Sequence, residues 1–63
     1  MKPVLSKLKL KRLLLCHTQQ EVADSIGISR SYLAAIENGR EILRDNILLR
    51  LSRYYKCKPA ELI

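Results

Sequence analysis

The stretch Thr18–Gly39, TQQEVADSIGISRSYLAAIENG, decides the fold expected for this chain. Thr18 is followed three residues later by Glu21, and this capping-box spacing predicts the start of a helix. Gly27 predicts the end of that helix, because glycine readily takes the positive φ of a left-handed terminus. Ser29 is a favourable N-cap for a second helix, which the closing Asn-Gly pair ends. The stretch therefore predicts two short helices joined by a tight turn.

Apolar residues within these two helices recur at helical spacing, which predicts one buried side on each. The expected inward-facing residues are Val22, Ala23, Ile26, Ile28, Leu33 and Ile36. Ala23 must be small, because two helices that cross at close range leave no room for a larger side chain. The other side of the second helix is expected to hold Arg30, Ser31, Ala34 and Ala35.

The sequence before this stretch predicts another helix, from about Val4 to Cys16, with Pro3 suited to its first turn. One side of this helix is expected to hold Leu5, Leu8, Arg12 and Leu15. A second apolar side holds Leu10, Leu13 and Leu14.

The sequence after the stretch predicts two further helices. Beyond a loop from Arg40 to Arg44, Asp45 is predicted to cap a fourth helix. Its buried stripe is expected to hold Ile47, Leu48, Leu51 and Tyr55. Pro59 opens a short fifth helix over Ala60–Ile63, in which Leu62 closes the core. The whole pattern predicts a single, compact five-helix, all-α domain over residues 1–63.

The charge of the chain indicates a polyanionic partner. Twelve Lys and Arg against six Asp and Glu give a net charge of +6, which suits nucleic acid or, less specifically, an anionic membrane surface. Basic residues interrupt every apolar run at the N-terminus, which argues against a signal peptide. No run approaches the roughly 20 apolar residues of a membrane span.

The cysteine and histidine content argues against a metal site. Cys16 and Cys57 are too far apart for a C-x-x-C motif, and His17 is the single histidine. No metal or other cofactor is therefore expected, and both cysteines are expected to be reduced and buried in a cytoplasmic protein. Because no nucleophile, base and orienting group occur at useful spacing, an enzyme is not expected.

Nine residues carry a resemblance to a known family: Gln19, Ala23, Gly27, Ile28, Leu33, Ile36, Glu37, Asn38 and Gly39. At these positions the chain resembles the Cro/C1-type (Xre) helix-turn-helix transcriptional regulators, which have a lambda-repressor-like DNA-binding domain. The resemblance implies that the second helix of the stretch enters the DNA major groove. The expected function is sequence-specific binding of double-stranded DNA by a transcriptional regulator, with repression as the expected direction.

The resemblance also assigns roles to individual residues. It places Arg30 and Ser31 at positions that relatives use on base edges, and the exposed side of the same helix adds Ala34 and Ala35. The expected contacts with the DNA backbone come from Gln19, Tyr32, Asn38, Arg40 and Arg44. For Tyr32, packing on a neighbouring helix is an equal alternative, and for Arg44 a solvated charge is another. Arg12 and Glu37 match an internal ion pair of relatives and are not expected to touch DNA.

The chain departs from the family pattern at two places near the helix ends. Cys16-His17 stands where relatives often have Gly-Leu, so the end of the first helix is expected to be built differently. Leu43 stands where the family usually has proline in the loop before the fourth helix.

The sequence does not decide which partners other than DNA the protein binds. Many relatives bind palindromic operators as two-fold dimers, and a possible homodimer surface is offered by Leu10, Leu14, Leu49 and Ile63. An alternative function is a protein-interaction module of the same fold, either an antitoxin or an adaptor with a protein partner. A membrane-surface peptide is disfavoured, because the core of a five-helix domain explains the leucines of the first helix better.

Overall fold

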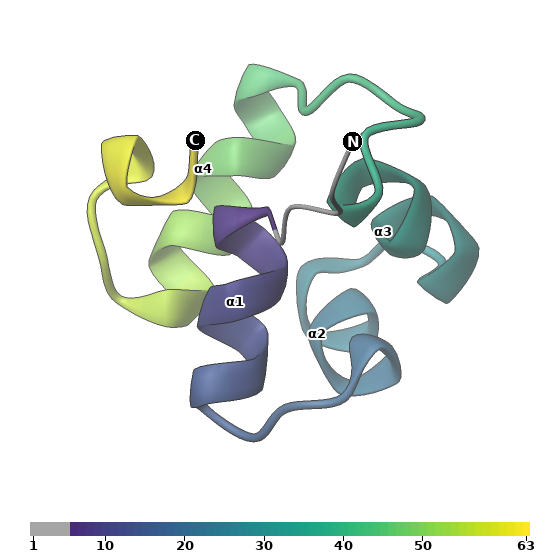
Figure 1. Ribbon diagram of the computed structural model, residues 1–63, viewed down its shortest axis with the longest axis horizontal. Coiled ribbons are helices and arrows are strands. Elements are labelled where there is room, and N and C mark those ends of the chain that lie inside the picture. Colours follow the sequence, from purple (N-terminus) through teal and green to yellow (C-terminus); the bar gives the residue numbers. More distant parts are fainter. Residues whose placement is uncertain (1–5) are drawn as a thin grey trace, which may run out of the picture.

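The computed structural model describes residues 6–63, and these form four α-helices and one short 3₁₀ helix without a strand (Figure 1). The elements are α1 (Lys7–Leu14), α2 (Gln19–Ile26), α3 (Arg30–Glu37), α4 (Asp45–Tyr55) and η1 (Pro59–Leu62). The prediction of an all-α fold is confirmed. The predicted fifth helix is a single 3₁₀ turn, which begins at Pro59 rather than at Ala60.

The predicted capping box at the start of α2 is present. The Glu21 N–H donates to Thr18 Oγ1 over 3.1 Å, and the Thr18 N–H donates to Glu21 Oε1 over 2.8 Å. The bond from the Thr18 backbone favours the charged carboxylate and so lowers the pKa of Glu21. Two of the otherwise unsatisfied N–H groups at this helix end therefore have acceptors.

The turn between α2 and α3 follows the local chemistry of its residues. Gly27 has a φ of +80°, and its N–H donates to the Ala23 carbonyl over 2.9 Å. Ser29 then caps α3, since its Oγ accepts the Tyr32 N–H over 3.0 Å. Ala23 is fully buried, as expected for a small residue in a helix that packs against both α3 and α4.

The boundaries predicted for the first helix are wrong within the described residues. Ser6 is the N-cap of α1 and accepts the Lys9 N–H, so the helix begins at Lys7; the predicted residues Pro3, Val4 and Leu5 lie outside the described part. The helix ends at Leu14, because Cys16 takes a left-handed conformation with a φ of +60°. This is the position where the resemblance places glycine, which takes that conformation without steric cost.

Two further expectations are corrected near the helix ends. Arg44, not Asp45, is the N-cap of α4, and Asp45 is the first residue inside the helix. Asp45 still stabilises α4, because a carboxylate in the first turn interacts favourably with the helix dipole. Cys16 is exposed rather than buried, since the left-handed turn carries it away from the core.

The core is formed by residues from one side of each helix, including η1. It consists of Leu8, Val22, Ala23, Ile26, Leu33, Ile36, Ile47, Leu51, Tyr55 and Leu62. Ile28, Tyr32, Leu43 and Leu48 pack against it while half-buried. Leu15 lies past the end of α1 with its side chain exposed, and the second apolar side of α1 also faces solvent.

Among the described residues, the Tyr55 hydroxyl is the one buried polar side-chain atom that has no hydrogen-bond partner. Its side chain is 6% exposed and its hydroxyl makes no hydrogen bond. Burial and the nearby negative charge of Glu37 raise the pKa of Tyr55 from 10.0 to about 12.

Gly27→Ala tests the turn between α2 and α3. Space does not limit the substitution, because the nearest atom to an added Cβ is the far end of Arg50 at 3.9 Å. The φ of +80° is the limit, and we expect a loss of about 1–2 kcal/mol in the free energy of unfolding. Urea denaturation measures this loss in the free energy of unfolding. Gly27→Asn is the control and is expected to cost less, since asparagine tolerates the left-handed region; equal losses would contradict a conformational cause.

The stability of the protein is expected to fall as the pH rises from 10 toward 12. In this window the unfolded tyrosine releases its proton while Tyr55 in the folded protein keeps its own, so unfolding becomes more favourable. The fall attributable to Tyr55 is about 2–3 kcal/mol, measured by denaturation at a series of pH values.

Tyr55→Phe is expected to remove this part of the fall. At neutral pH the variant is expected to be as stable as the parent or slightly more so, because the lost hydroxyl had no partner. Tyr32→Phe is the matched control and is expected to keep the fall. An unchanged pH dependence in Tyr55→Phe would assign the effect to another group.

Candidate nucleic-acid interface

The four predicted base-contact residues lie along one side of α3. Arg30 and Ser31 are exposed in its first turn, and Ala34 and Ala35 are half-buried one turn later. The opposite side of the same helix is buried through Leu33, Ile36 and Glu37. The exposed side therefore carries polar side chains at its N-terminal end and small side chains in its middle. The helix α3 lies at the edge of the molecule (Figure 1).

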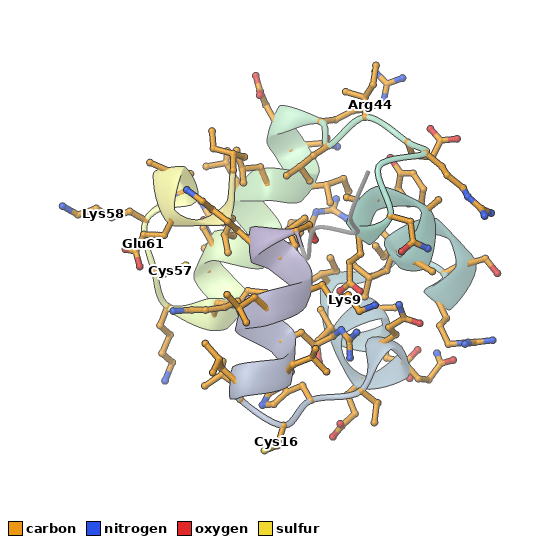
Figure 2. All side chains as sticks on the ribbon, in the orientation of Figure 1. Lys9, Cys16, Arg44, Cys57, Lys58 and Glu61 are labelled. Atoms are coloured by element: carbon orange, nitrogen blue, oxygen red, sulfur yellow. The ribbon has the colours of Figure 1, made fainter. Side chains whose placement is uncertain are left out.

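The loop after α3 is tied to the helix by its own backbone. The N–H groups of Arg40 and Glu41 both donate to the Ala35 carbonyl, over 2.8 and 3.2 Å. Asn38 is the C-cap of α3, and its N–H donates to the Ala34 carbonyl over 2.9 Å. These bonds hold Asn38 and Arg40 at the end of α3. Arg44 lies farther along the loop, at the start of α4 (Figure 2).

A buried ion pair joins α1 to the last residue of α3. Arg12 Nε lies 2.9 Å from Glu37 Oε2, and Arg12 Nη2 lies 3.1 Å from Glu37 Oε1. The two side chains are 8% and 1% exposed. The third nitrogen of the guanidinium donates to the His17 carbonyl over 3.0 Å, so Arg12 also holds the loop between α1 and α2.

Gln19 completes this network from the start of α2. Its Nε2 donates to Glu37 Oε1 over 3.1 Å. A side-chain amide has two N–H donors, so the second one is free for another acceptor. Glu37 thus orients the same residue that the resemblance assigns to a DNA phosphate.

Two other contacts brace α2 and its preceding loop against α4. His17 Nδ1 and the Tyr54 hydroxyl form a hydrogen bond, and the two rings meet edge to face with centroids 5.4 Å apart. Arg50 Nη1 donates to the Ile26 carbonyl at the end of α2, over 3.1 Å. The sequence analysis missed both contacts, because nothing local signals an interaction across 37 or 24 residues.

A hollow of about 620 Å³ opens beside the N-terminal end of α3. It is lined by Lys9, Arg12, Leu13, Cys16, His17, Thr18, Gln19, Gln20 and Arg30, so no aspartate or glutamate is among its lining residues. Two of the predicted contact residues, Gln19 and Arg30, meet here. Lys9 also reaches this hollow from α1, and the sequence analysis did not select it, because one lysine in a basic helix carries no signal of its direction.

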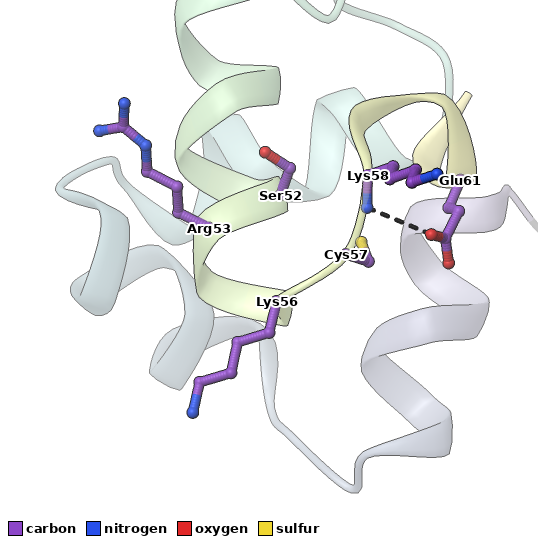
Figure 3. Close-up of a pocket in the computed structure, with 6 residues that line it drawn as sticks. All are labelled: Ser52, Arg53, Lys56, Cys57, Lys58 and Glu61. Carbon is purple, nitrogen blue, oxygen red and sulfur yellow. Dashed lines mark hydrogen bonds between the residues drawn. The ribbon is translucent and has the colours of Figure 1, made fainter.

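A second hollow, of about 460 Å³, lies between the end of α4 and η1 (Figure 3). Cys57 and Ser52 line it together with Arg53, Lys56, Lys58 and Glu61. The Ser52 hydroxyl donates to the Leu49 carbonyl, and Glu61 accepts the Lys58 N–H over 3.2 Å.

Within residues 6–63, no group of three histidine, cysteine, aspartate or glutamate side chains is arranged to bind a metal ion. None of the helices in this described part has the length and apolar character needed to cross a membrane.

The comparisons with known proteins agree with this geometry. The helix-turn-helix family model matches residues 8–62, so the chain belongs to the Cro/C1-type helix-turn-helix family of DNA-binding transcription regulators. The structure is similar to that of the restriction-modification controller protein C.AhdI from Aeromonas hydrophila. The TM-score is 0.85 and the identity 26%, over 90% of this chain and 86% of that chain. No curated protein sequence matches the chain.

Glu37→Gln tests the energetic weight of the ion pair. The substitution leaves the buried Arg12 charge without a carboxylate, and we expect it to lower the free energy of unfolding by about 3–5 kcal/mol. Glu41→Gln is the control, because Glu41 is exposed, and its effect is expected to stay within about 0.5 kcal/mol. Denaturant unfolding measures both, and equal effects would contradict the assignment.

A double-mutant cycle measures the interaction energy between Arg12 and Glu37 separately from the effect of each substitution. Arg12→Met is expected to cost as much as Glu37→Gln, because it leaves Glu37 buried with only the Gln19 amide as donor. The combined variant Arg12→Met with Glu37→Gln is expected to be more stable than the sum of the single losses predicts. Strictly additive losses would show that the two charges act independently.

Proposed function

We propose that this helix-turn-helix protein binds a specific sequence of double-stranded DNA by placing α3 in the major groove, and that it represses transcription there. The observation that carries the proposal is the two-sided character of α3. Its exposed side holds Arg30, Ser31 and two alanines, while its other side is buried and anchored through Glu37 to α1 and α2. A helix held this way loses little entropy on binding.

The residue types on the exposed side suit base edges. Arg30 can pair with O6 and N7 of guanine through two parallel hydrogen bonds, which is the commonest specific contact in the major groove. Ser31 can donate to or accept from a neighbouring base, and Ala34 and Ala35 leave space for the groove floor, where a thymine methyl makes apolar contact. A helix with larger side chains at the two alanine positions would stand farther from the bases.

Contacts with the DNA backbone are proposed to supply most of the affinity. Gln19 has one amide N–H committed to Glu37 and a second one for a phosphate oxygen. The other proposed backbone contacts are Tyr32 within α3, Asn38 and Arg40 at its end, and Arg44 at the start of α4. The net charge of +6 supports this role, and binding is therefore expected to weaken as salt rises.

Repression needs nothing beyond occupancy of a promoter, since a protein bound there blocks polymerase. The likeness to a restriction-modification controller supports control of transcription by this chain. We further propose that residues 1–63 act as one DNA-binding domain and that two copies bind inverted half-sites about 34–36 Å apart. Four exposed apolar residues support a surface between the copies: Leu10, Leu14, Leu49 and Ile63.

Selection of bound duplexes from a random DNA pool tests the proposal. The parent protein is expected to enrich one motif, with two inverted half-sites if it binds as a dimer. Arg30→Ala is expected to lose discrimination at one guanine position by about 1–3 kcal/mol while the other positions stay readable.

Arg53→Ala is the matched control, because it removes one exposed arginine from α4, outside the proposed interface. It is expected to keep the motif unchanged. Enrichment of no motif by the parent protein would overturn sequence-specific binding, and a motif unaffected by Arg30→Ala would overturn the assigned role of Arg30.

A further inference from the structure

Lys9 lies outside the two helices of the helix-turn-helix unit but faces the same side of the molecule. It is half-buried in the first turn of α1 and lines the hollow of about 620 Å³ together with Gln19, Gln20 and Arg30. Figure 2 shows it on the side of α1 toward α2 and α3, whereas Lys58 and Glu61 lie on the opposite side of the molecule. The tertiary fold therefore brings a cation of α1 to the start of α3.

The carboxylates of Glu21 and Asp24 accept hydrogen bonds from Thr18 and Gln20, which leaves Lys9 and Arg30 as the unpaired cations among the described residues that line this hollow. Arg12 also lines it, but Glu37 neutralises that guanidinium. The Arg12–Glu37 contact is the one ion pair within 4.0 Å among residues 6–63, so the Lys9 ammonium has no carboxylate partner in the described part of the chain. The Arg30 guanidinium likewise has no carboxylate partner in the described part of the chain, and no aspartate or glutamate lines the hollow.

The helix dipole of α2 has its positive end at this place. The Glu21 carboxylate accepts the Thr18 N–H and offsets part of that field, and the Glu21 N–H is already committed to Thr18 Oγ1. Gln19 and Gln20 are the first two residues of α2, and both line the hollow. The dipole thus has the same sign as the ammonium of Lys9 and the guanidinium of Arg30.

We propose that Lys9 binds a phosphate of the DNA backbone in this hollow, next to the base pair that Arg30 contacts. The inference rests on the proposed function, because the phosphate belongs to the DNA in whose groove α3 lies. It extends the interface from the helix-turn-helix unit to α1. A lysine ammonium is a point charge on a flexible stem, so this contact contributes affinity and position but carries no information about sequence.

The chain offers a matched control on the same helix. Lys11 is also half-buried on α1, but it lines a different hollow, of about 390 Å³, together with Leu10, Leu14 and Glu61. Lys9→Ala and Lys11→Ala therefore remove the same charge from the same helix on different sides. The N-terminal cap of α1 survives in Lys9→Ala, since Ser6 accepts from the backbone N–H of residue 9.

Binding is measured at several salt concentrations on two duplexes, one with the selected motif and one of random sequence. Lys9→Ala is expected to weaken binding to both roughly three- to tenfold and to lower the slope of log K against log salt by about 0.9, without changing the motif. Lys11→Ala is expected to change both quantities much less. Lys9→Arg keeps the charge and is expected to restore most of the affinity.

Neutral methylphosphonate linkages then locate the contact. Each linkage near the guanine read by Arg30 is neutralised in turn, and the parent protein is expected to lose affinity at several of them. At one linkage, neutralisation is expected to cause no loss of affinity in Lys9→Ala, because the phosphate that the missing ammonium would have bound is the one neutralised. Circular dichroism and urea denaturation establish that each variant is folded.

The outcomes separate this inference from the proposed function. Equal effects of Lys9→Ala and Lys11→Ala, or additive effects at every linkage, overturn the Lys9 contact while a selected motif leaves sequence-specific binding intact. A parent protein that selects no motif overturns the proposed function. In that case, loss of random-duplex affinity in Lys9→Ala alone still supports a phosphate contact.

Discussion

The buried pair of Arg12 and Glu37 is the interaction on which the geometry of the interface depends. Glu37 is the last residue of α3, and its carboxylate accepts from Arg12 on α1 and from Gln19 on α2. Arg12 also holds the carbonyl of His17 in the loop between those two helices. One carboxylate thus links three helices and adds directional contacts to the packing of a small core.

Such a pair contributes more to position than to stability. Removing two charges from water is costly, and apolar residues of similar size often stabilise a core at least as well. The hydrogen bonds of a guanidinium and a carboxylate are directional, however, so they define one arrangement of the elements. Under the proposed function this arrangement matters, because it presents α3 to DNA as a rigid body, with Arg30 and Ser31 at one end and the half-buried alanines between them and the loop.

The cations of the chain have different surroundings, and these decide what each can do. Arg12 is neutralised inside the protein and Arg50 is committed to a carbonyl at the end of α2. Lys9 and Arg30 have no carboxylate among the lining residues of their shared hollow. The overall charge of +6 therefore favours a polyanionic partner, and the distribution of pairing supports the proposed surface for it.

The sequence by itself determined α2, its turn and α3, because the capping box at Thr18, the left-handed Gly27 and the cap at Ser29 all act within a few residues. Similar local reasoning was wrong at Cys16, which takes a left-handed conformation that is locally unfavourable for a residue other than glycine, and at Asp45, where Arg44 is the N-cap. Only the tertiary structure decided the direction of Lys9, the tie from Gln19 to Glu37 and the contact of His17 with Tyr54. These features join residues far apart in the chain, so they exist only once the core has packed and set the distances between elements.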